Sequence, residues 1–145
     1  LVHRLSNLQL DNTNKITDMN AKEVLTKEEL QLFSGIKDKV ALFNLKGPIA
    51  FAAARGFAKK IGITGNYKAL LLDFSEVDLL DITSCEAVGE VIAQHLDAGL
   101  GIYLIGLNGS IADIMQRLLV LDRLDDNSIF STRLEALQAA SDQYN

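Results

Sequence analysis

The residues best placed to do chemistry gather in the segment 70–91. Asp81, Thr83 and Ser84 stand together where an apolar run gives way to a helical pattern. A hydroxyl at a helix start can accept hydrogen bonds from free backbone N–H groups, and the same position favours a bound anion. Two interpretations follow: a regulatory turn open to phosphorylation, or a Thr83 or Ser84 side chain that only caps the helix.

Carboxylates accompany this turn. Glu76 and Asp78 precede Asp81 in a segment, residues 75–82, whose composition predicts an acidic loop. A phosphate on Thr83 would add about −1.5 to −2 charges beside them, so it would weaken or reshape a contact. The same carboxylates make a basic partner surface the natural complement of the turn.

A second candidate is the turn Gly106–Ser110, between a predicted strand and a predicted helix. Asn108, Gly109 and Ser110 could hold a phosphate or nucleotide weakly through backbone N–H groups. The turn lacks the lysine of a P-loop and the spacing of a dinucleotide-binding loop. The alternative is an ordinary turn in which Ser110 caps the helix, with Asp113 three residues later.

No residues in the sequence form a catalytic or metal-binding pattern. The two histidines, His3 and His95, have neither a metal-ligand spacing nor a cysteine cluster, so no metal is expected. Cys85 lies on the apolar stripe of a predicted helix, which favours a core thiol, and His95 is expected to be half-buried on that helix. Because no nucleophile–histidine arrangement has support from spacing, we expect neither an enzyme nor a cofactor.

The composition narrows the class of protein further. The chain has 145 residues, with 14 Lys and Arg against 19 Asp and Glu, a net charge of −5 that argues against nucleic-acid binding. Its hydrophobic fraction of 48% is enough for a buried core. The single cysteine favours a reducing compartment, and no apolar run approaches the roughly 20 residues of a membrane span. Because the chain starts at Leu1 without Met, we expect a piece of a longer protein.

Alternating strands and helices would position these turns. Apolar runs predict strands at 40–45, 68–74, 101–106 and 129–130, the first ended by Gly47-Pro48. Helices are predicted at 51–61 and 83–96, after Ser110, and after a Thr132 cap paired with Glu135. This pattern predicts an α/β fold, a small mixed sheet with helices packed on it.

The N-terminal residues 1–38 have a different composition. Residues 10–20 read as a polar linker, and a helix is predicted from Ala21 to Phe33. Asn20 and Glu23 have the spacing of a capping box, and Ser34-Gly35 is expected to end the helix.

The order strand, acidic loop, Asp-x-Thr and helix resembles that of STAS domains. That fold is shared by anti-sigma-factor antagonists and by the tails of sulfate permease (SulP) family anion transporters. Asp81 and Thr83 match the family's turn, Asp-Ser/Thr-Ser/Thr-Gly, and Thr83 falls on the position that the antagonists phosphorylate. Ile82 and Ser84 depart from the pattern, where a hydroxyl and a glycine are usual, which counts against the antagonists' phosphorylation cycle.

The segment 43–57 resembles the transporter branch, where a strand runs into Gly-Pro, an apolar residue, Phe and small residues. The resemblance covers about residues 39–138 and looks like the cyanobacterial bicarbonate transporters of that family. It implies a STAS domain at 39–145 after a juxtamembrane linker and helix at 1–38, on the cytoplasmic face of the plasma membrane. The implied role is regulation and assembly of a bicarbonate or sulfate transporter, with its membrane domain as partner and a homodimer as the assembly. The alternative is a free-standing, antagonist-like phospho-switch that binds a kinase.

Overall fold

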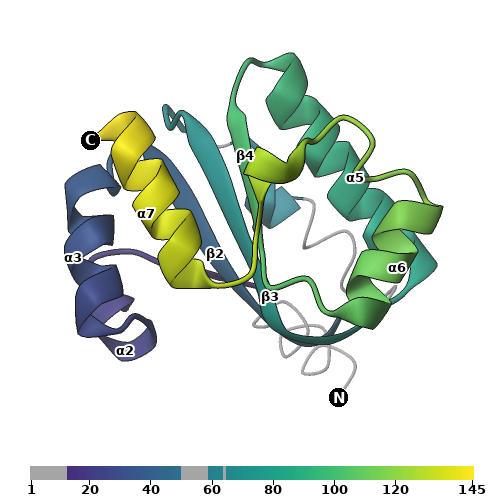
Figure 1. Cartoon of the computed structure of the whole chain (residues 1–145), viewed down its shortest axis with the longest axis horizontal. Helices are drawn as coiled ribbons and strands as arrows, with labels where there is room; N and C mark the ends of the chain where they lie inside the picture. The colour runs from purple at the N-terminus through teal and green to yellow at the C-terminus, as the bar shows by residue number, and fades with distance from the viewer. Residues whose placement is uncertain (1–12, 50–58, 64) are drawn as a thin grey trace.

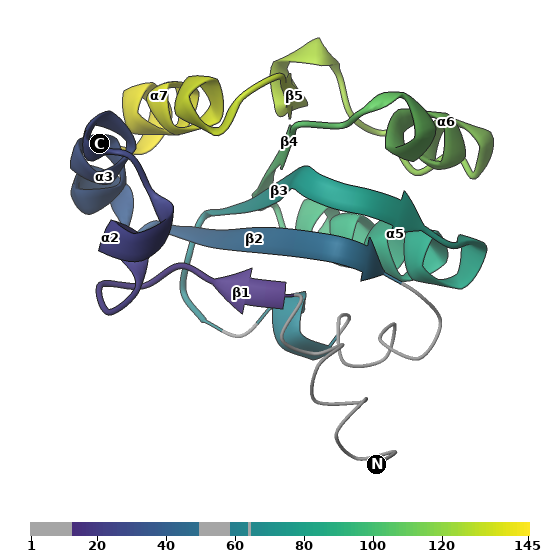
Figure 2. The same ribbon diagram turned by 90° about the horizontal axis from the view of Figure 1, so that it is seen from below.

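The computed structural model describes residues 13–49, 59–63 and 65–145. A five-stranded sheet in the order β1-β2-β3-β4-β5 forms its centre, as Figure 2 shows. The strands are β1 (Thr13–Lys15), β2 (Val40–Ile49), β3 (Ala69–Leu80), β4 (Gly101–Ile105) and β5 (Ile129–Phe130). β1 runs antiparallel to β2 and the other neighbouring pairs are parallel, so the predicted mixed α/β sheet is confirmed.

Helices cover both faces of this sheet (Figure 1). They are α2 (Ala21–Val24), α3 (Lys27–Ile36), α5 (Ile82–Asp97), α6 (Gly109–Arg117) and α7 (Arg133–Tyr144). α3 and α7 pack on one face over Leu42 and Leu71, and α5 and α6 pack on the other over Leu70 and Leu72. Successive β3 side chains point to opposite faces, so a strand covered on both sides needs the unbroken apolar run that the sequence has there.

The two central strands are longer than predicted. β2 continues through Gly47-Pro48 to Ile49, with its register against β3 shifting on either side of Lys46. Proline is tolerated in a strand at such irregularities. β3 continues to Leu80, so the predicted loop 75–82 is mostly strand. Its polar residues Ser75, Glu76 and Asp78 misled the prediction because they are exposed, although Val77 and Leu80 of the same segment are buried.

The predicted helix Ala21–Phe33 is two helices. Leu25 has an extended backbone, and Thr26 caps α3, which continues past Ser34-Gly35 to Ile36. The predicted box at Asn20 is wrong, because the capping box joins Thr26 and Glu29. The Glu29 N–H donates to Thr26 Oγ1 (3.2 Å), and the Thr26 N–H donates to Glu29 Oε1 (2.9 Å).

Residues from the N-terminal region contact the main sheet directly. β1 pairs with β2, and α3 packs against α7 with Phe33 and Ile36 buried. The division of the chain at residue 38 stays a prediction. Of the predicted helix 51–61, residues 51–58 lie outside the described residues, and residues 59–61 are helical.

Candidate functional site

Asp81 caps helix α5. Its backbone is extended, and its Oδ1 accepts a hydrogen bond from the Ser84 N–H (2.8 Å). A carboxylate at this position satisfies a free N–H group and interacts favourably with the helix dipole. The prediction that Thr83 or Ser84 caps the helix is therefore wrong. An aspartate accepts the same bond as a hydroxyl, and the helix begins at Ile82, earlier than expected.

The two hydroxyls that follow differ in exposure. Thr83 is exposed on the first turn of α5, whereas Ser84 is fully buried. The Ser84 Oγ has no hydrogen-bond partner among the described residues. Cys85, next in the chain, is also fully buried, and burial, with a smaller contribution from Glu86, raises the pKa of its thiol to about 11. Of these three groups, only Thr83 is presented to a partner or a modifying enzyme.

The surface around Thr83 is both acidic and apolar. Glu76 and Asp78 are exposed on the last residues of β3, just before the turn. Leu79 and Ile82 lie beside them with 55% and 61% of their surface exposed. Large exposed apolar side chains bordered by charges are typical of contact surfaces. The turn is thus suited to bind a partner.

In the second predicted turn, Gly106–Ser110, the polar side chains bond to groups of the protein itself. Asn108 caps the start of α6: its Oδ1 accepts from the Ile111 N–H (3.1 Å), and its Nδ2 donates to the Val77 carbonyl (3.0 Å). Ser110, the predicted cap, instead donates its hydroxyl to Asn108 Oδ1 (3.1 Å). The bond to Val77 ties this turn to β3, four residues before Asp81. Strand β3 therefore connects the two predicted sites. Because the Asn108 side chain already accepts from the Ile111 N–H, one of the free N–H groups that a phosphate would need at the start of α6 is occupied.

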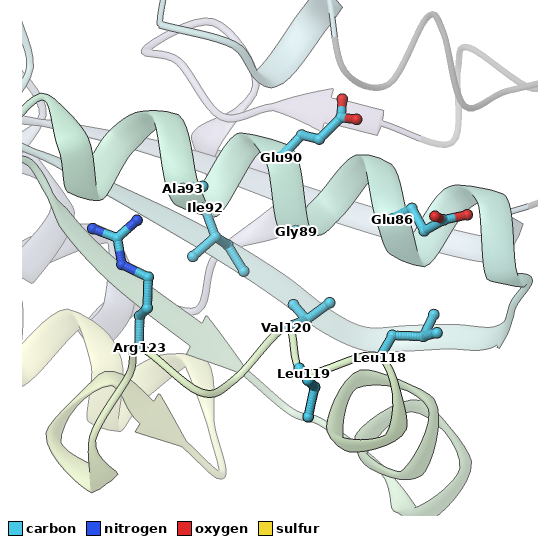
Figure 3. A pocket seen from close by; sticks show the side chains of 9 residues that line it. All are labelled: Glu86, Gly89, Glu90, Ile92, Ala93, Leu118, Leu119, Val120 and Arg123. Atoms are coloured by element: carbon cyan, nitrogen blue, oxygen red, sulfur yellow. The ribbon is translucent and has the colours of Figure 1, made fainter.

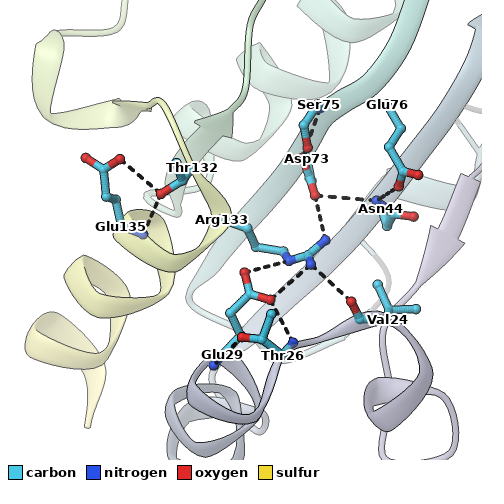
Figure 4. Close-up of polar contacts among 10 residues, drawn as sticks. All are labelled: Val24, Thr26, Glu29, Asn44, Asp73, Ser75, Glu76, Thr132, Arg133 and Glu135. Atoms are coloured by element: carbon cyan, nitrogen blue, oxygen red, sulfur yellow. Dashed lines mark hydrogen bonds and ion pairs between the residues drawn. The ribbon is translucent and has the colours of Figure 1, made fainter.

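A buried ionic network was not predicted. Arg133 opens α7, and its guanidinium makes a two-bond contact with Glu29, with Nε to Oε2 and Nη2 to Oε1 both 3.0 Å. Its Nη1 also donates to Asp73 Oδ2 (3.0 Å), and its Nη2 donates to the Val24 carbonyl (3.0 Å), as Figure 4 shows. The side chains of Asp73 and Glu29 are 0% and 7% exposed. One arginine thus joins α2, α3, α7 and β3.

This network stabilises charges that burial would otherwise oppose. Burial acts to raise the pKa of Glu29, but hydrogen bonds from Arg133 and Thr26 outweigh it and hold that pKa below its usual value. Burial likewise acts to lower the pKa of Arg133, yet its two carboxylate partners raise it. A groove of about 520 Å³ borders the network. Because the guanidinium already donates four hydrogen bonds, it has little capacity left for an anion.

One signal in the sequence pointed to this network. Asp73 is the single charged residue within the apolar run 69–74. A charge in a strand covered on both faces needs a buried partner. The identity of that partner was out of reach, because Arg133 lies 60 residues away in the chain.

His95 is fully buried, although a half-buried side chain was predicted. Its Nδ1 lies 2.7 Å from the Val91 carbonyl and its Nε2 lies 2.6 Å from the Tyr67 hydroxyl. A carbonyl only accepts, so Nδ1 carries the proton and Nε2 accepts from the tyrosine. Burial lowers the pKa of His95. In the described part of the chain, no group of three or more His, Cys, Asp or Glu side chains is arranged to hold a metal ion.

Comparisons with known proteins agree with this architecture. The bicarbonate transporter BicA of Picosynechococcus sp. is 28% identical over 139 residues, which make up 96% of this chain and 25% of that protein. BicA of Synechocystis sp. is 26% identical over the same shares. The chain thus spans about a quarter of the length of these curated relatives. In the described residues, no helix is both long and apolar enough to cross a membrane.

The fold is also found in a solved structure. The STAS domain of a SulP transporter from Vibrio cholerae superposes with a TM-score of 0.65 at 20% identity, covering 81% of this chain and 97% of that one. The family model described as the STAS domain matches residues 35–136, which include β2 to β5 and the turn at Asp81. The chain therefore belongs to the STAS domain family.

Proposed function

We propose that this chain is the cytoplasmic regulatory and assembly domain of a SulP-family membrane anion transporter, and that Asp81–Ser84 is its regulatory turn. The observation that carries the proposal is the geometry of this turn. Asp81 caps α5 and the buried Ser84 anchors its first turn, while Thr83 and Ile82 stay exposed. A rigid scaffold that presents an exposed loop is the usual way a domain offers a binding surface.

The transported anion is proposed to be bicarbonate, with sulfate as the alternative. Support comes from the relatives named as bicarbonate transporters, which match this chain along 96% of its length. Transport itself would take place in a membrane domain. The role of this chain would be to bind that domain and to join two copies of the transporter in a homodimer.

The chemistry of the turn favours a basic partner. Glu76, Asp78 and Asp81 supply negative charge, and the exposed Leu79 and Ile82 supply apolar contact area. Charge complementarity of this kind chooses the partner and speeds its approach. A cytoplasmic loop of the membrane domain fits, since such loops carry an excess of lysine and arginine.

The second candidate function is the phospho-switch. It is favoured by one observation: Thr83 matches the phosphorylated position of the antagonists and is exposed. A phosphate there would lie beside Asp81 and one helical turn from Glu86, so these carboxylates would repel it. The added negative charge would also disfavour binding of an acidic partner surface.

The test measures bicarbonate uptake by the full-length protein with and without residues 39–145, and with Thr83→Asp. We expect uptake to change in both cases while the melting temperature of Thr83→Asp barely moves, because a carboxylate is tolerated at a helix start. Ser110→Asp is the matched control, since it places the same charge at the second residue of α6. Unchanged uptake in both the truncated protein and Thr83→Asp would refute the regulatory role.

Assembly is tested separately. Analytical ultracentrifugation of this chain should show a dimer at high micromolar concentration if the domain contributes to joining two transporters. A monomer at that concentration would remove assembly from the proposal and leave the regulatory turn as its content.

A further inference from the structure

A second surface lies on the side of α5 that faces the turn after α6. The two segments form a groove of about 380 Å³ with an apolar floor (Figure 3). The apolar residues that line it include Ile92 of α5 and the consecutive residues Leu118, Leu119 and Val120, with the Leu119 side chain pointing away from α5 (Figure 3). The groove is separate from the Asp81–Ser84 turn, although both are built on α5.

The groove contains a leucine where the backbone favours glycine. Leu119 has φ of 59°, and it is the one non-glycine residue with positive φ in the described part of the chain. The Leu119 N–H donates to the Gln116 carbonyl (3.1 Å) and the Val120 N–H donates to the Met115 carbonyl (2.9 Å), as in a Schellman motif. Glycine is usual at this position because it adopts positive φ without strain. The Leu119 side chain is 65% exposed, so it is not kept there by burial in the core. Folding of the turn does not explain this leucine, whereas a contact with a partner would.

A glycine in α5 sets the shape of the groove. A Cβ built at Gly89 would lie 3.2 Å from Val120 Cγ2, which is a tight contact. Glycine in the middle of a helix is unfavourable, so its presence here is explained by the close approach of the turn to α5. The floor of the groove is therefore a built feature of the packing.

The rim of the groove is acidic. Glu86 and Glu90 are exposed and stand four residues apart on α5, hence on one face of the helix. Neither makes an ion pair within the described residues. The one basic residue of the lining, Arg123, pairs with Asp97 (2.9 Å), so its charge is already offset. Two unpaired carboxylates therefore border an apolar floor that carries an exposed leucine.

We propose that this groove binds a basic amphipathic helix from the cytoplasmic side of the transporter's membrane domain, an assignment of the partner that rests on the proposed function. Two carboxylates one helical turn apart complement two lysines or arginines one turn apart on a partner helix. The apolar face of that helix would cover Leu119 and the floor, as in other helix-in-groove contacts. Segments near the cytoplasmic face of a membrane are rich in basic residues, which makes them suitable partners.

The same charges argue against other partners. In a symmetric dimer formed through this groove, Glu86 and Glu90 of one copy would face the same residues of the other, and like charges oppose that contact. An anionic lipid surface or a nucleic acid would be repelled for the same reason.

The experiment uses this chain, labelled with ¹⁵N, and a synthetic helical peptide of about 18 leucine, alanine and lysine residues, long enough to form a helix. Its lysines stand four residues apart beside one leucine stripe, and a matched peptide has glutamate at every lysine. We expect NMR shifts for the lysine peptide that centre on Glu86–Ala93 and Leu118–Val120, and none for the glutamate peptide. Shifts of equal size for both peptides, or shifts centred elsewhere, would overturn the proposal.

Two variants sharpen the result. Glu86→Lys with Glu90→Lys should weaken binding at least about tenfold, because it reverses the rim charge. Its control, Glu28→Lys with Asp142→Lys, makes the same change in net charge on α3 and α7 and should leave binding unchanged. Equal weakening by both pairs would show a non-specific attraction between charges and would overturn the groove.

Leu119→Gly separates binding from folding. Glycine suits the positive φ, so the variant should melt at the same or a higher temperature, yet it should bind the lysine peptide about fivefold more weakly because a central apolar anchor is lost. Unchanged binding would contradict the role given to Leu119. If the groove behaves as expected while uptake does not depend on residues 39–145, the proposed function fails and the groove stands. If uptake depends on those residues but the peptide does not bind, only the groove fails.

Discussion

On the face of the sheet covered by α3 and α7, a buried arginine joins segments that are far apart in the chain. On the face covered by α5 and α6, Asp81 and Asn108 make hydrogen bonds to backbone groups at the helix starts, and exposed apolar and acidic residues remain at the surface. Glu29 and Asp73 on the first face have their charges paired by Arg133, whereas Glu86 and Glu90 on the second have no ion pair in the described residues. We infer that the first face mainly holds the fold together and that the second is available for partners.

The largest expected effect tests the first face. Arg133→Ala would leave Glu29 and Asp73 buried without their cation, and breaking a buried ion pair from one side costs roughly 3–5 kcal/mol of stability. Urea unfolding monitored by circular dichroism measures it. The matched control is Arg123→Ala, which removes the exposed pair with Asp97 and should cost less than about 1 kcal/mol. If the two variants lose equal amounts of stability, the face covered by α3 and α7 is not the one that mainly holds the fold together.

The two faces should also respond to different ranges of pH. The pKa of Glu29 is lowered in the folded protein, so its stabilising contribution is present above its ordinary value of 4.5 and is lost as the pH falls below it. Burial lowers the pKa of His95, so the unfolded chain binds its proton first, and stability falls as the pH drops below the ordinary value of 6.5.

Unfolding by urea at a series of pH values between 7.5 and 4 should therefore show two successive losses of stability. Glutamine has no ionisable side chain, so the first loss should disappear when the free energy of unfolding of His95→Gln is followed across the same pH series. A first loss that persists in the variant would assign the effect to another group.

A smaller effect is expected at the start of α5. Asp81→Ala removes the side chain that accepts from the Ser84 N–H, and loss of such a cap costs about 1 kcal/mol. Thermal unfolding measures the change. Asn108→Ala at the start of α6 serves as comparison and should cost more, because Asn108 also donates to the Val77 carbonyl. If Asp81→Ala leaves the melting temperature unchanged, the turn is not held by this cap.

The smallest effect is expected for Thr83→Ala. Thr83 is exposed and does not cap α5, so its loss should change stability by less than about 0.5 kcal/mol, as at other surface positions. Differential scanning calorimetry is sensitive enough to compare it with Asp81→Ala. A destabilisation as large as that of Asp81→Ala would return Thr83 to the role of a structural cap.

Much of the fold followed from local patterns in the sequence. The apolar runs located β2, β3, β4 and β5, and the Thr132 cap with Glu135 was correct, with the Glu135 N–H donating to Thr132 Oγ1 (3.2 Å). Errors arose where polarity and exposure were confused. The end of β3 carries exposed carboxylates and was taken for a loop, and the helix start moved because an aspartate replaced the expected hydroxyl.

The sequence by itself determined the alternation of strands and helices, the acidic character of the turn at Asp81 and the similarity to STAS domains. These depend on residues that are neighbours in the chain, where periodicity and capping preferences act. The pairing of Arg133 with Glu29 and Asp73, and the groove between α5 and residues 118–120, were decided only by the tertiary structure. The network depends on contacts between residues 60 or more positions apart, so the lone charge of Asp73 in an apolar run signals a buried partner without identifying it. The groove depends on the packing of α5 against a turn whose backbone conformation leucine rarely adopts, and that conformation leaves no local pattern in the sequence.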